Sequence, residues 1–318
     1  MIKRPLGKTG IKVSEVSFGT VSLGIPYGIG INGKEDMISE KDAIELLLLA
    51  LDKGINFFDT ARAYGCSEER IGKAFKGRRQ EFIISTKCAH LYDKNGQLPS
   101  ADGLKRTIDA SLDKSLSALQ TDYVDIYMMH DGNIDIISNK TIVKTLSGYK
   151  KKGTIRATGI STYTVDETLK AIESGVWDVI QVAYNLMDQS QGKLFSLAKQ
   201  NGVGIVVRSV LFKGVLTDRG SNLHPKLKTI QEHRELYNEL LSDKIPALSD
   251  LATKFVLSSP EVSSILVGID KPEYLESALA VADGNYLDEE TFIRAKQLTY
   301  SNPEFLDLHK WAINGWLT

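Results

Sequence analysis

The chain has 318 residues, of which 42% are hydrophobic and 25% are charged, which is the composition of an ordinary globular protein. Its formal net charge of −1 provides no basic field to attract nucleic acid or an anionic membrane. It contains no apolar run of about eighteen residues, the length that a membrane-spanning helix needs. Two cysteines are too few to stabilise a chain of this length through disulfides. We therefore expect a protein of the reducing cytoplasm that does not span a membrane.

Apolar runs alternate with amphipathic helical patterns along the chain, and this alternation predicts strands and helices in turn. A turn at 7–10 predicts a small N-terminal β-hairpin. Further strands are expected at 15–18, 56–59, 82–87, 124–130, 156–161, 179–183, 204–209 and 263–267. Helices are expected at 40–53, 67–75, 100–119, 142–152, 165–173, 191–201, 245–258, 273–282 and 288–298.

Eight strands that are each followed by a helix predict a closed parallel (β/α)8 TIM barrel, built as one domain over residues 1–318. The strands are nearly continuous hydrophobic runs, as expected for strands covered on both faces. A doubly wound open sheet is the main alternative. Long connections at 22–39 and 210–241 and the tail at 299–318 are expected at the mouth of the barrel, where long loops shape substrate pockets.

The segment 28–33 matches the glycine pattern of dinucleotide-binding folds, but its context is wrong. That motif must follow a strand and open directly into a helix. Here Pro26 and Tyr27 precede the glycines, and the next helix is expected to begin only after Ser39, its predicted N-cap. We interpret the segment as a glycine loop and not as part of a Rossmann fold.

Titratable side chains stand at the ends of several predicted strands. Asp59, Lys87 and His130 each end an apolar strand, and Tyr64 follows Asp59 on its connecting loop. Taken singly, they have ordinary structural interpretations: a turn cap, a solvated strand end, a core histidine and a packed loop aromatic. In a barrel, however, the strand ends converge on one opening, which is where active sites lie.

The four groups suit proton transfer to an oxygen. A phenol is a poor acid near neutrality because its pKa is about 10, and an ammonium group close by favours the phenolate. Asp59 is positioned in sequence to hold Lys87 charged, and His130 to donate a hydrogen bond to a substrate oxygen. A metal-dependent hydrolase using His130 and Asp131 is disfavoured, because no second histidine ends a strand. We expect no metal.

Six segments together resemble one known family, the aldo-keto reductase superfamily, over nearly the whole chain. They are Leu6-Gly7-Lys8-Thr9-Gly10, Phe18-Gly19-Thr20, 56–65, Ser85-Thr86-Lys87, Tyr127-Met128-Met129-His130 and the region of Gly268. The resemblance implies a (β/α)8 barrel that binds NADP(H) or NAD(H) without a Rossmann fold. It also implies Tyr64 as the general acid, Lys87 and Asp59 as its tuning pair, and His130 as the residue that orients the substrate.

The resemblance further implies a cofactor site. Ser161 and Thr162 correspond to a Ser-Asn pair that holds the nicotinamide amide, and Tyr184 to an aromatic that stacks on the nicotinamide ring. Segment 208–217 resembles the pyrophosphate loop, with Val210 where the family usually has proline. The whole implied set is Gly19, Thr20, Ser161, Thr162, Gln181, Tyr184, Arg208, Ser209, Val210, Leu211, Gly214, Gly268, Asp270, Lys271 and Tyr274.

Near the adenosine, this chain departs from the family pattern. Asp270 stands where the family commonly begins a phosphate-binding series, and a carboxylate repels a 2′-phosphate but accepts hydrogen bonds from ribose hydroxyls. We therefore expect selectivity for NADP over NAD to be weakened or reversed. The alternative is that Asp270 only caps the following helix.

The predicted function is NAD(P)(H)-dependent interconversion of a carbonyl (aldehyde, ketone or sugar) and an alcohol. The alternative is a cofactor-binding redox sensor or auxiliary subunit with slow or no turnover. The expected partner is a small molecule, with no nucleic acid and no membrane. Polar neighbours favour hydroxylated substrates, and the candidate substrate residues are Tyr27, His90, Asp131 and Trp311.

Overall fold

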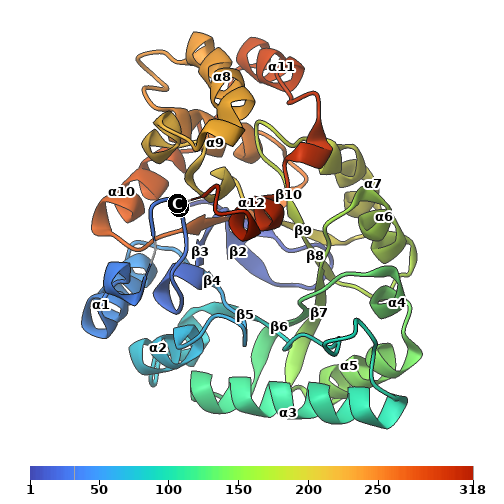
Figure 1. Cartoon of the computed structure of the whole chain (residues 1–318). Coiled ribbons are helices and arrows are strands. Elements are labelled where there is room, and N and C mark those ends of the chain that lie inside the picture. The colour runs from blue at the N-terminus through green and yellow to red at the C-terminus, as the bar shows by residue number, and fades with distance from the viewer. Residues whose placement is uncertain (32, 318) are drawn as a thin grey trace.

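A closed barrel of parallel strands forms the centre of the molecule in the computed structural model, which describes residues 1–31 and 33–317 (Figure 1). The strands follow one another around the barrel in chain order, and the last pairs with the first. They are β3 (Val16–Gly19), β4 (Phe57–Asp59), β5 (Ile83–Lys87), β6 (Val124–Met129), β7 (Ile155–Ser161), β8 (Val179–Ala183), β9 (Gly204–Arg208) and β10 (Val262–Gly268). The barrel prediction is confirmed, and the open sheet is excluded.

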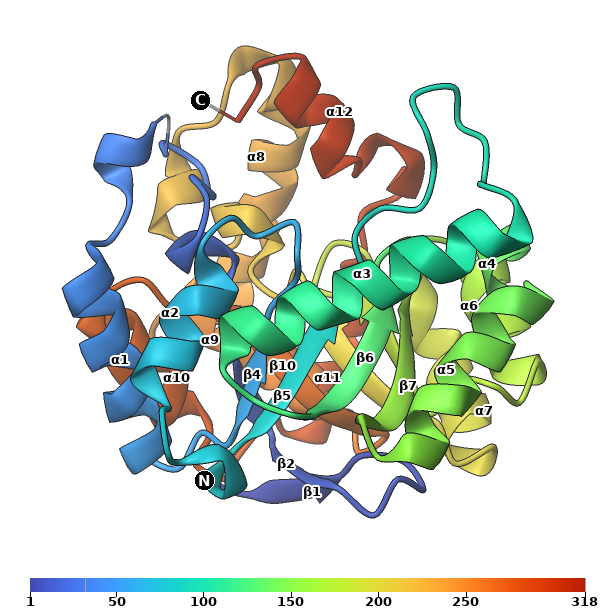
Figure 2. The same ribbon diagram turned by 90° about the horizontal axis from the view of Figure 1, so that it is seen from below.

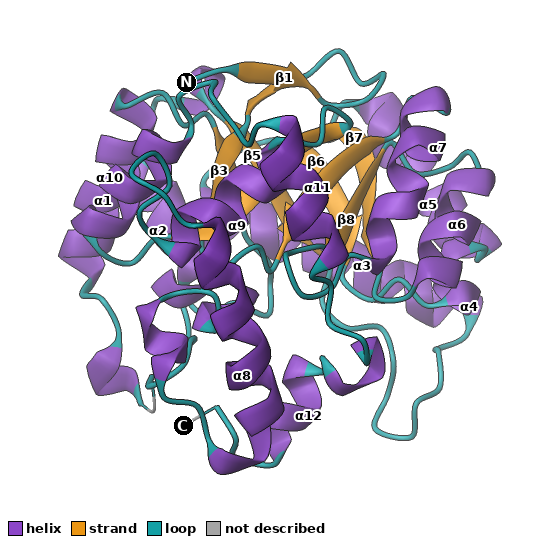
Figure 3. Ribbon diagram, turned by 90° about the horizontal axis from the view of Figure 1, so that it is seen from above, coloured by secondary structure: helices purple, strands orange, loops and turns teal. Residues whose placement is uncertain are grey.

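Helices surround the barrel on its outside (Figures 1 and 3). Those that match predicted segments are α1 (Glu40–Asp52), α2 (Ser67–Ala74), α3 (Ala101–Leu119), α5 (Lys140–Lys152), α6 (Val165–Glu173), α7 (Phe195–Gln200), α9 (Leu248–Leu257), α10 (Pro272–Val281) and α11 (Glu289–Gln297). Three more helices lie in segments expected to be loops or tail: α4 (Ile134–Ile137), α8 (Lys228–Leu236) and α12 (Leu308–Ile313). Ser39 caps α1 by accepting a hydrogen bond from the amide of Asp42, as predicted.

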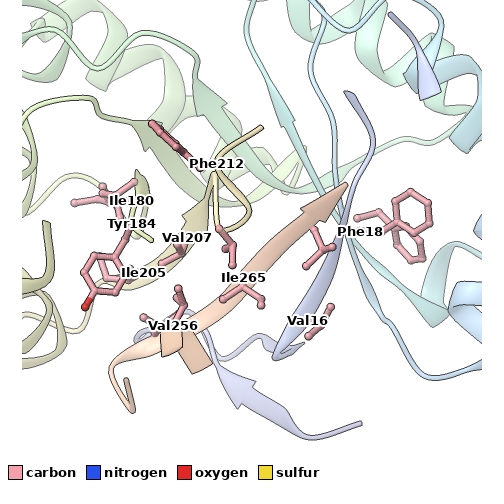
Figure 4. Packing of buried hydrophobic residues seen from close by; sticks show 14 of the residues in the cluster. Val16, Phe18, Ile180, Tyr184, Ile205, Val207, Phe212, Val256 and Ile265 are labelled. Carbon is pink, nitrogen blue, oxygen red and sulfur yellow. The ribbon is translucent and has the colours of Figure 1, made fainter. Parts of the chain in front are cut away.

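The strands divide their side chains between two hydrophobic cores. Inside the barrel, Phe57, Ile126 and Val206 belong to one cluster. Their chain neighbours, such as Phe58 and Val207, belong to the larger cluster between the strands and the helices, part of which Figure 4 shows. This division follows from the two-residue period of a strand, which sends successive side chains to opposite faces. The same period therefore decides which polar side chains at the strand ends face the interior.

The two ends of the barrel are built differently. The predicted N-terminal hairpin, β1 (Lys3–Pro5) and β2 (Lys12–Ser14), closes the end at which the strands begin (Figure 2). Its Leu6, Ile11 and Val13 belong to the interior cluster and so plug that end. At the other end lie α8, α12 and the loop before α1 (Figure 2). No helix in the described residues is long and apolar enough to cross a membrane.

Candidate active site

A buried ion pair lies at the carboxyl ends of two adjacent strands. Nζ of Lys87 on β5 lies 2.5 Å from Oδ2 of Asp59 on β4 and donates to the carbonyl oxygen of Thr60 at 3.0 Å. The two side chains are only 1% and 3% exposed. Burial opposes a charge on Lys87, but the Asp59 carboxylate and the Tyr64 phenol outweigh it and raise the pKa of the lysine. The ammonium is therefore kept charged although it is buried.

Tyr64 and His130 stand beside this pair. Nζ of Lys87 is 5.0 Å from the centre of the Tyr64 ring, and the rings of Tyr64 and His130 meet edge to face at 5.8 Å. Burial, together with the nearby Lys87 and His90, lowers the pKa of His130 to about 3, so its imidazole is neutral near pH 7. The structure thus brings the four predicted catalytic side chains together, with a charged lysine and a neutral histidine.

Strand period explains which other predicted residues reach the interior. Ser161, Gln181 and Arg208 are in phase with interior residues of their strands and line the central cavity. Thr162 and Tyr184 are out of phase and face the outer layer. The Thr162 hydroxyl bonds that of Thr168 at 2.7 Å, within a fully buried pair.

Tyr184 does not take the position that the resemblance implied. Its ring is 2% exposed and packs at 5.0 Å from the ring of Phe195 and 5.5 Å from that of Phe255, among the outer-core residues of Figure 4. It does not line the cavity, so it cannot stack on a ring bound there. The two-residue period places Tyr184 with Ile180 and Val182 on the helix-facing side of β8.

The cavity has a volume of about 630 Å³ and is lined by residues from both ends of the chain. Three of the four catalytic candidates, Asp59, Tyr64 and His130, form part of its wall. Of the cofactor set, twelve residues line it: Gly19, Thr20, Ser161, Gln181, Arg208, Ser209, Val210, Leu211, Gly214, Gly268, Asp270 and Tyr274. Lys271, which caps α10, is not among the lining residues.

The cavity wall also carries a carboxylate oxygen without a partner in the described part of the chain. Oδ1 of Asp270 is buried, and within the described residues it has no hydrogen-bond partner. A ribose hydroxyl would satisfy it as a donor. Beside it, Gly268 leaves open space where a Cβ would stand, and Ser277 and Ala278 of α10 complete the wall. One cavity is therefore lined both by residues predicted to transfer a proton and by an acceptor that a hydroxyl group could satisfy.

The sequence analysis did not predict several contacts made by the lining residues. Gln181, which belongs to the predicted cofactor set, also donates from Nε2 to Oδ1 of Asp59 at 3.0 Å. Arg219 donates to the hydroxyl of Tyr274 at 3.0 Å, and Lys213 lies 5.0 Å from the ring centre of Tyr27. Both cations come from the long 210–241 connection, where no local periodicity distinguishes a cavity residue from a surface one.

The predicted substrate residues are distributed over different environments. Tyr27 lines the cavity. His90 and Asp131 are bonded to each other at 2.7 Å, and the His90 ring stacks on His130 with ring centres 4.7 Å apart. Trp311, by contrast, is 1% exposed and donates its indole N–H to the carbonyl oxygen of Phe305. It does not line the cavity but packs on the ring of Phe212.

Comparison with known proteins agrees with this architecture. The profile of the aldo/keto reductase family matches residues 15–299. The chain is 33% identical to the L-galactose dehydrogenase of Arabidopsis thaliana in an alignment of length 305 that covers 91% of each chain. It is 29% identical to an NADH-specific methylglyoxal reductase of Escherichia coli, with 91% of this chain and 95% of that one covered.

A solved structure is also similar. The holo form of an aldo-keto reductase from Bacillus halodurans superimposes with a TM-score of 0.79 and 28% identity, covering 95% of this chain and 97% of the other. The extent of the profile match and the barrel lead to one assignment. This chain belongs to the aldo/keto reductase family, a family of oxidoreductases.

Proposed function

We propose that this protein interconverts a carbonyl compound and an alcohol with NAD(P)(H), and that Tyr64 is the proton donor and acceptor. The observation that carries the proposal is the buried Lys87–Asp59 pair beside the Tyr64 phenol, on the wall of a cavity that extends to Asp270. When bound, the nicotinamide would supply or accept the hydride.

Three side chains supply the charge stabilisation, the proton transfer and the hydrogen bond to the substrate. Lys87, held charged by Asp59, stabilises negative charge at the phenol oxygen when the proton leaves. Tyr64 gives its proton to the oxygen of the reacting carbonyl, or takes it back from the alcohol in the reverse direction. Neutral His130 is a hydrogen-bond donor to the same oxygen, since one of its ring nitrogens carries hydrogen.

The proposed choice of cofactor follows from the charge at Asp270 in the cavity wall. We propose that Asp270 accepts hydrogen bonds from the adenosine ribose, so that NADH is used at least as well as NADPH. Burial raises the pKa of Asp270, while Arg219 and Lys271 oppose that rise. These two cations are the groups available to a 2′-phosphate if the carboxylate is removed.

The test is a panel of aldehydes, ketones and sugars assayed with both cofactors, with Tyr64→Phe as the diagnostic variant. Loss of the phenol should lower kcat by about 10²–10⁴-fold while the Kd of the cofactor stays within a few-fold. Tyr163→Phe is the matched control, because Tyr163 also lines the cavity but lies over Arg208 and not over Lys87. Undiminished turnover by Tyr64→Phe would contradict the proposed role.

The same assay separates an enzyme from a sensor subunit that oxidises its bound cofactor once. We expect many turnovers per site with the preferred substrate. Oxidation that stops at one cofactor per chain, with every compound of the panel, would favour the sensor.

A further inference from the structure

A cation on the cavity wall, Arg208, is held by neutral groups. It ends β9, and its side chain lines the cavity. Its guanidinium donates to the carbonyl oxygen of Thr162 at 3.1 Å and lies 4.6 Å from the ring centre of Tyr163. Within residues 1–31 and 33–317 it forms no ion pair with a carboxylate. Since a guanidinium does not lose its proton in proteins, a full positive charge faces the cavity.

The register of the barrel sets this charge beside the proposed proton-transfer group. On the neighbouring strand β8, Gln181 pairs with Val206, which lies one interior step before Arg208 on β9. Nε2 of Gln181 donates to Oδ1 of Asp59 at 3.0 Å, so this level of the barrel also carries the Lys87–Asp59 pair. Arg208 therefore stands one step nearer the open end of the barrel than that pair.

The other nitrogen bases at the reacting centre add no net charge to it. Lys87 is neutralised by its carboxylate partner at 2.5 Å, and His130 is neutral near pH 7. Burial is the main cause of the low pKa of His130, but the charge of Arg208 contributes to it, so that charge is within electrostatic range. Asp131 is bonded to His90 and is not among the lining residues. On the wall of the reacting centre, the unbalanced charge is therefore that of Arg208.

From this charge distribution we infer that Arg208 makes the protein select the redox form of its cofactor, by favouring the reduced nicotinamide over the oxidised one. NADH and NAD⁺ share the same pyrophosphate and adenosine, but only the ring of NAD⁺ carries a positive charge. The ring has to lie close to Tyr64, because its hydride goes to the carbon whose oxygen Tyr64 protonates. It then shares the wall with the guanidinium, and like charges in a partly buried site repel each other more strongly than in water.

The inference rests on the proposed carbonyl chemistry at Tyr64 and extends it to the binding of the cofactor. A nicotinamide ring that becomes cationic when its hydride leaves is bound less tightly after carbonyl reduction than before it. The oxidised cofactor is therefore released readily in that direction. In alcohol oxidation it has to enter against the same charge, so this direction needs a higher concentration of NAD⁺.

A second arginine of the cavity wall provides a matched control. Arg219 also packs on a tyrosine: it donates to the hydroxyl of Tyr274 at 3.0 Å, and its guanidinium carbon lies 5.5 Å from the ring centre. Its charge opposes the raised pKa of Asp270, which is the proposed acceptor for the adenosine ribose. Both redox forms carry this ribose. Arg219→Gln should therefore weaken the binding of NADH and NAD⁺ by the same factor.

The experiment measures the Kd of NADH and the Kd of NAD⁺ for the whole chain by titration calorimetry, at one ionic strength and without substrate. The quantity compared is the ratio of the Kd of NAD⁺ to that of NADH, so a general loss of affinity cancels. In the wild type this ratio should be about tenfold or more, and in Arg208→Gln it should fall by about tenfold. Arg208→Lys keeps the charge and should retain most of the ratio, and Arg219→Gln should retain all of it.

The same ratio for NADP⁺ and NADPH, which differ by the same charge, should fall equally in Arg208→Gln. An unchanged ratio in this variant, even with both affinities reduced, would indicate a structural role; it would overturn the inference and leave the proposed function intact. An equal fall in Arg219→Gln would overturn it as well, because the effect would then not belong to Arg208. If the wild type bound none of the four cofactor forms, the proposed function would fail, and the inference with it.

Discussion

Two neighbouring nitrogen bases, Lys87 and His130, are held in different charge states by the groups around them. Lys87 keeps its proton because Asp59 lies 2.5 Å away. His130 loses its proton because burial and the charge on Lys87 both oppose a second cation. Each state suits its proposed role: a cation that stabilises the phenolate and a neutral donor to the substrate.

The neutral state of His130 should make the fold less stable in acid. Between pH 6.5 and about 3 the unfolded chain binds a proton at this histidine and the folded chain does not, so stability falls as pH falls. The loss should be about 2 kcal/mol between pH 7 and pH 5. His90, whose pKa is raised, acts in the opposite direction.

Urea unfolding of the wild type and of His130→Gln at both pH values isolates this contribution. The variant should lose less stability over the same interval. Equal losses in the two proteins would show that His130 titrates normally in the folded state.

The proposed cofactor choice also depends on one residue. In Asp270→Ser, the ratio of kcat/KM for NADPH to that for NADH should rise about tenfold or more, because a repelling carboxylate is removed next to Arg219. Asp113→Ser, which removes an exposed charge on α3, controls for net charge. A strong NADPH preference already present in the wild type would refute the assignment.

At the scale of elements, the loop between β4 and α2, which carries Tyr64, is fixed by close packing against the loop after β3. A Cβ on Gly24 would lie 1.8 Å from the backbone oxygen of Tyr64 and 2.8 Å from the amide nitrogen of Ser67. The hydroxyl of Ser67 also bonds that of Thr20 at 2.6 Å. The position of the phenol thus depends on a small residue about forty positions earlier in the chain.

Gly24→Ala should therefore displace Tyr64 and lower kcat by about 10²-fold, since misplacement by about 1 Å is that costly. The Kd of the cofactor is the companion measurement and should change less. Gly148→Ala, on α5 with no atom within 4 Å of the new Cβ, should leave activity unchanged. Full activity in Gly24→Ala would show that the loop can move aside without cost.

The C-terminal tail packs against a turn beside the cavity, and its Trp311 does not line the cavity. The 209–214 turn places Ser209, Phe212 and Lys213 at positive φ, a conformation that costs side-chain-bearing residues free energy. Trp311 of α12 packs on Phe212 with ring centres 5.4 Å apart. This contact helps to hold the strained turn in place, which accounts for a buried tryptophan in a segment expected to line the pocket.

For the molecule as a whole, stability and function lie at opposite ends of the barrel, as is usual in this architecture. At the closed end, Arg4 of the hairpin pairs with the fully buried carboxylate of Glu15 at 3.1 Å. Its guanidinium also donates to the carbonyl oxygens of Leu257 and Val262. One side chain thereby joins the first residues of the chain to the last strand.

Arg4→Ala should lower the free energy of unfolding by about 3 kcal/mol, because it leaves a buried carboxylate without its cation. In contrast, kcat/KM per folded molecule should stay within twofold of the wild type. Lys41→Ala, which breaks an exposed pair with Glu45, should change neither quantity measurably. Equal loss of activity and stability in Arg4→Ala would indicate that the two ends are coupled.

Much of this structure could be predicted from the sequence. All eight barrel strands and most helices begin and end within two or three residues of their predicted bounds, because hydrophobic period reports burial locally. The two-residue period of β8 places Tyr184 on the helix-facing side of the strand, whereas the resemblance to the family implied a position in the cavity. The structure agrees with the two-residue period.

The sequence by itself determined the order of strands and helices and the residues at the strand ends, since both depend on patterns a few residues long. Only the tertiary structure decided that Gln181 bonds Asp59, that Arg219 reaches Tyr274 and that His90 stacks on His130. The two members of each pair lie on different strands, helices or connections, up to 122 positions apart. Barrel closure and loop conformation bring them together, and no local pattern encodes either.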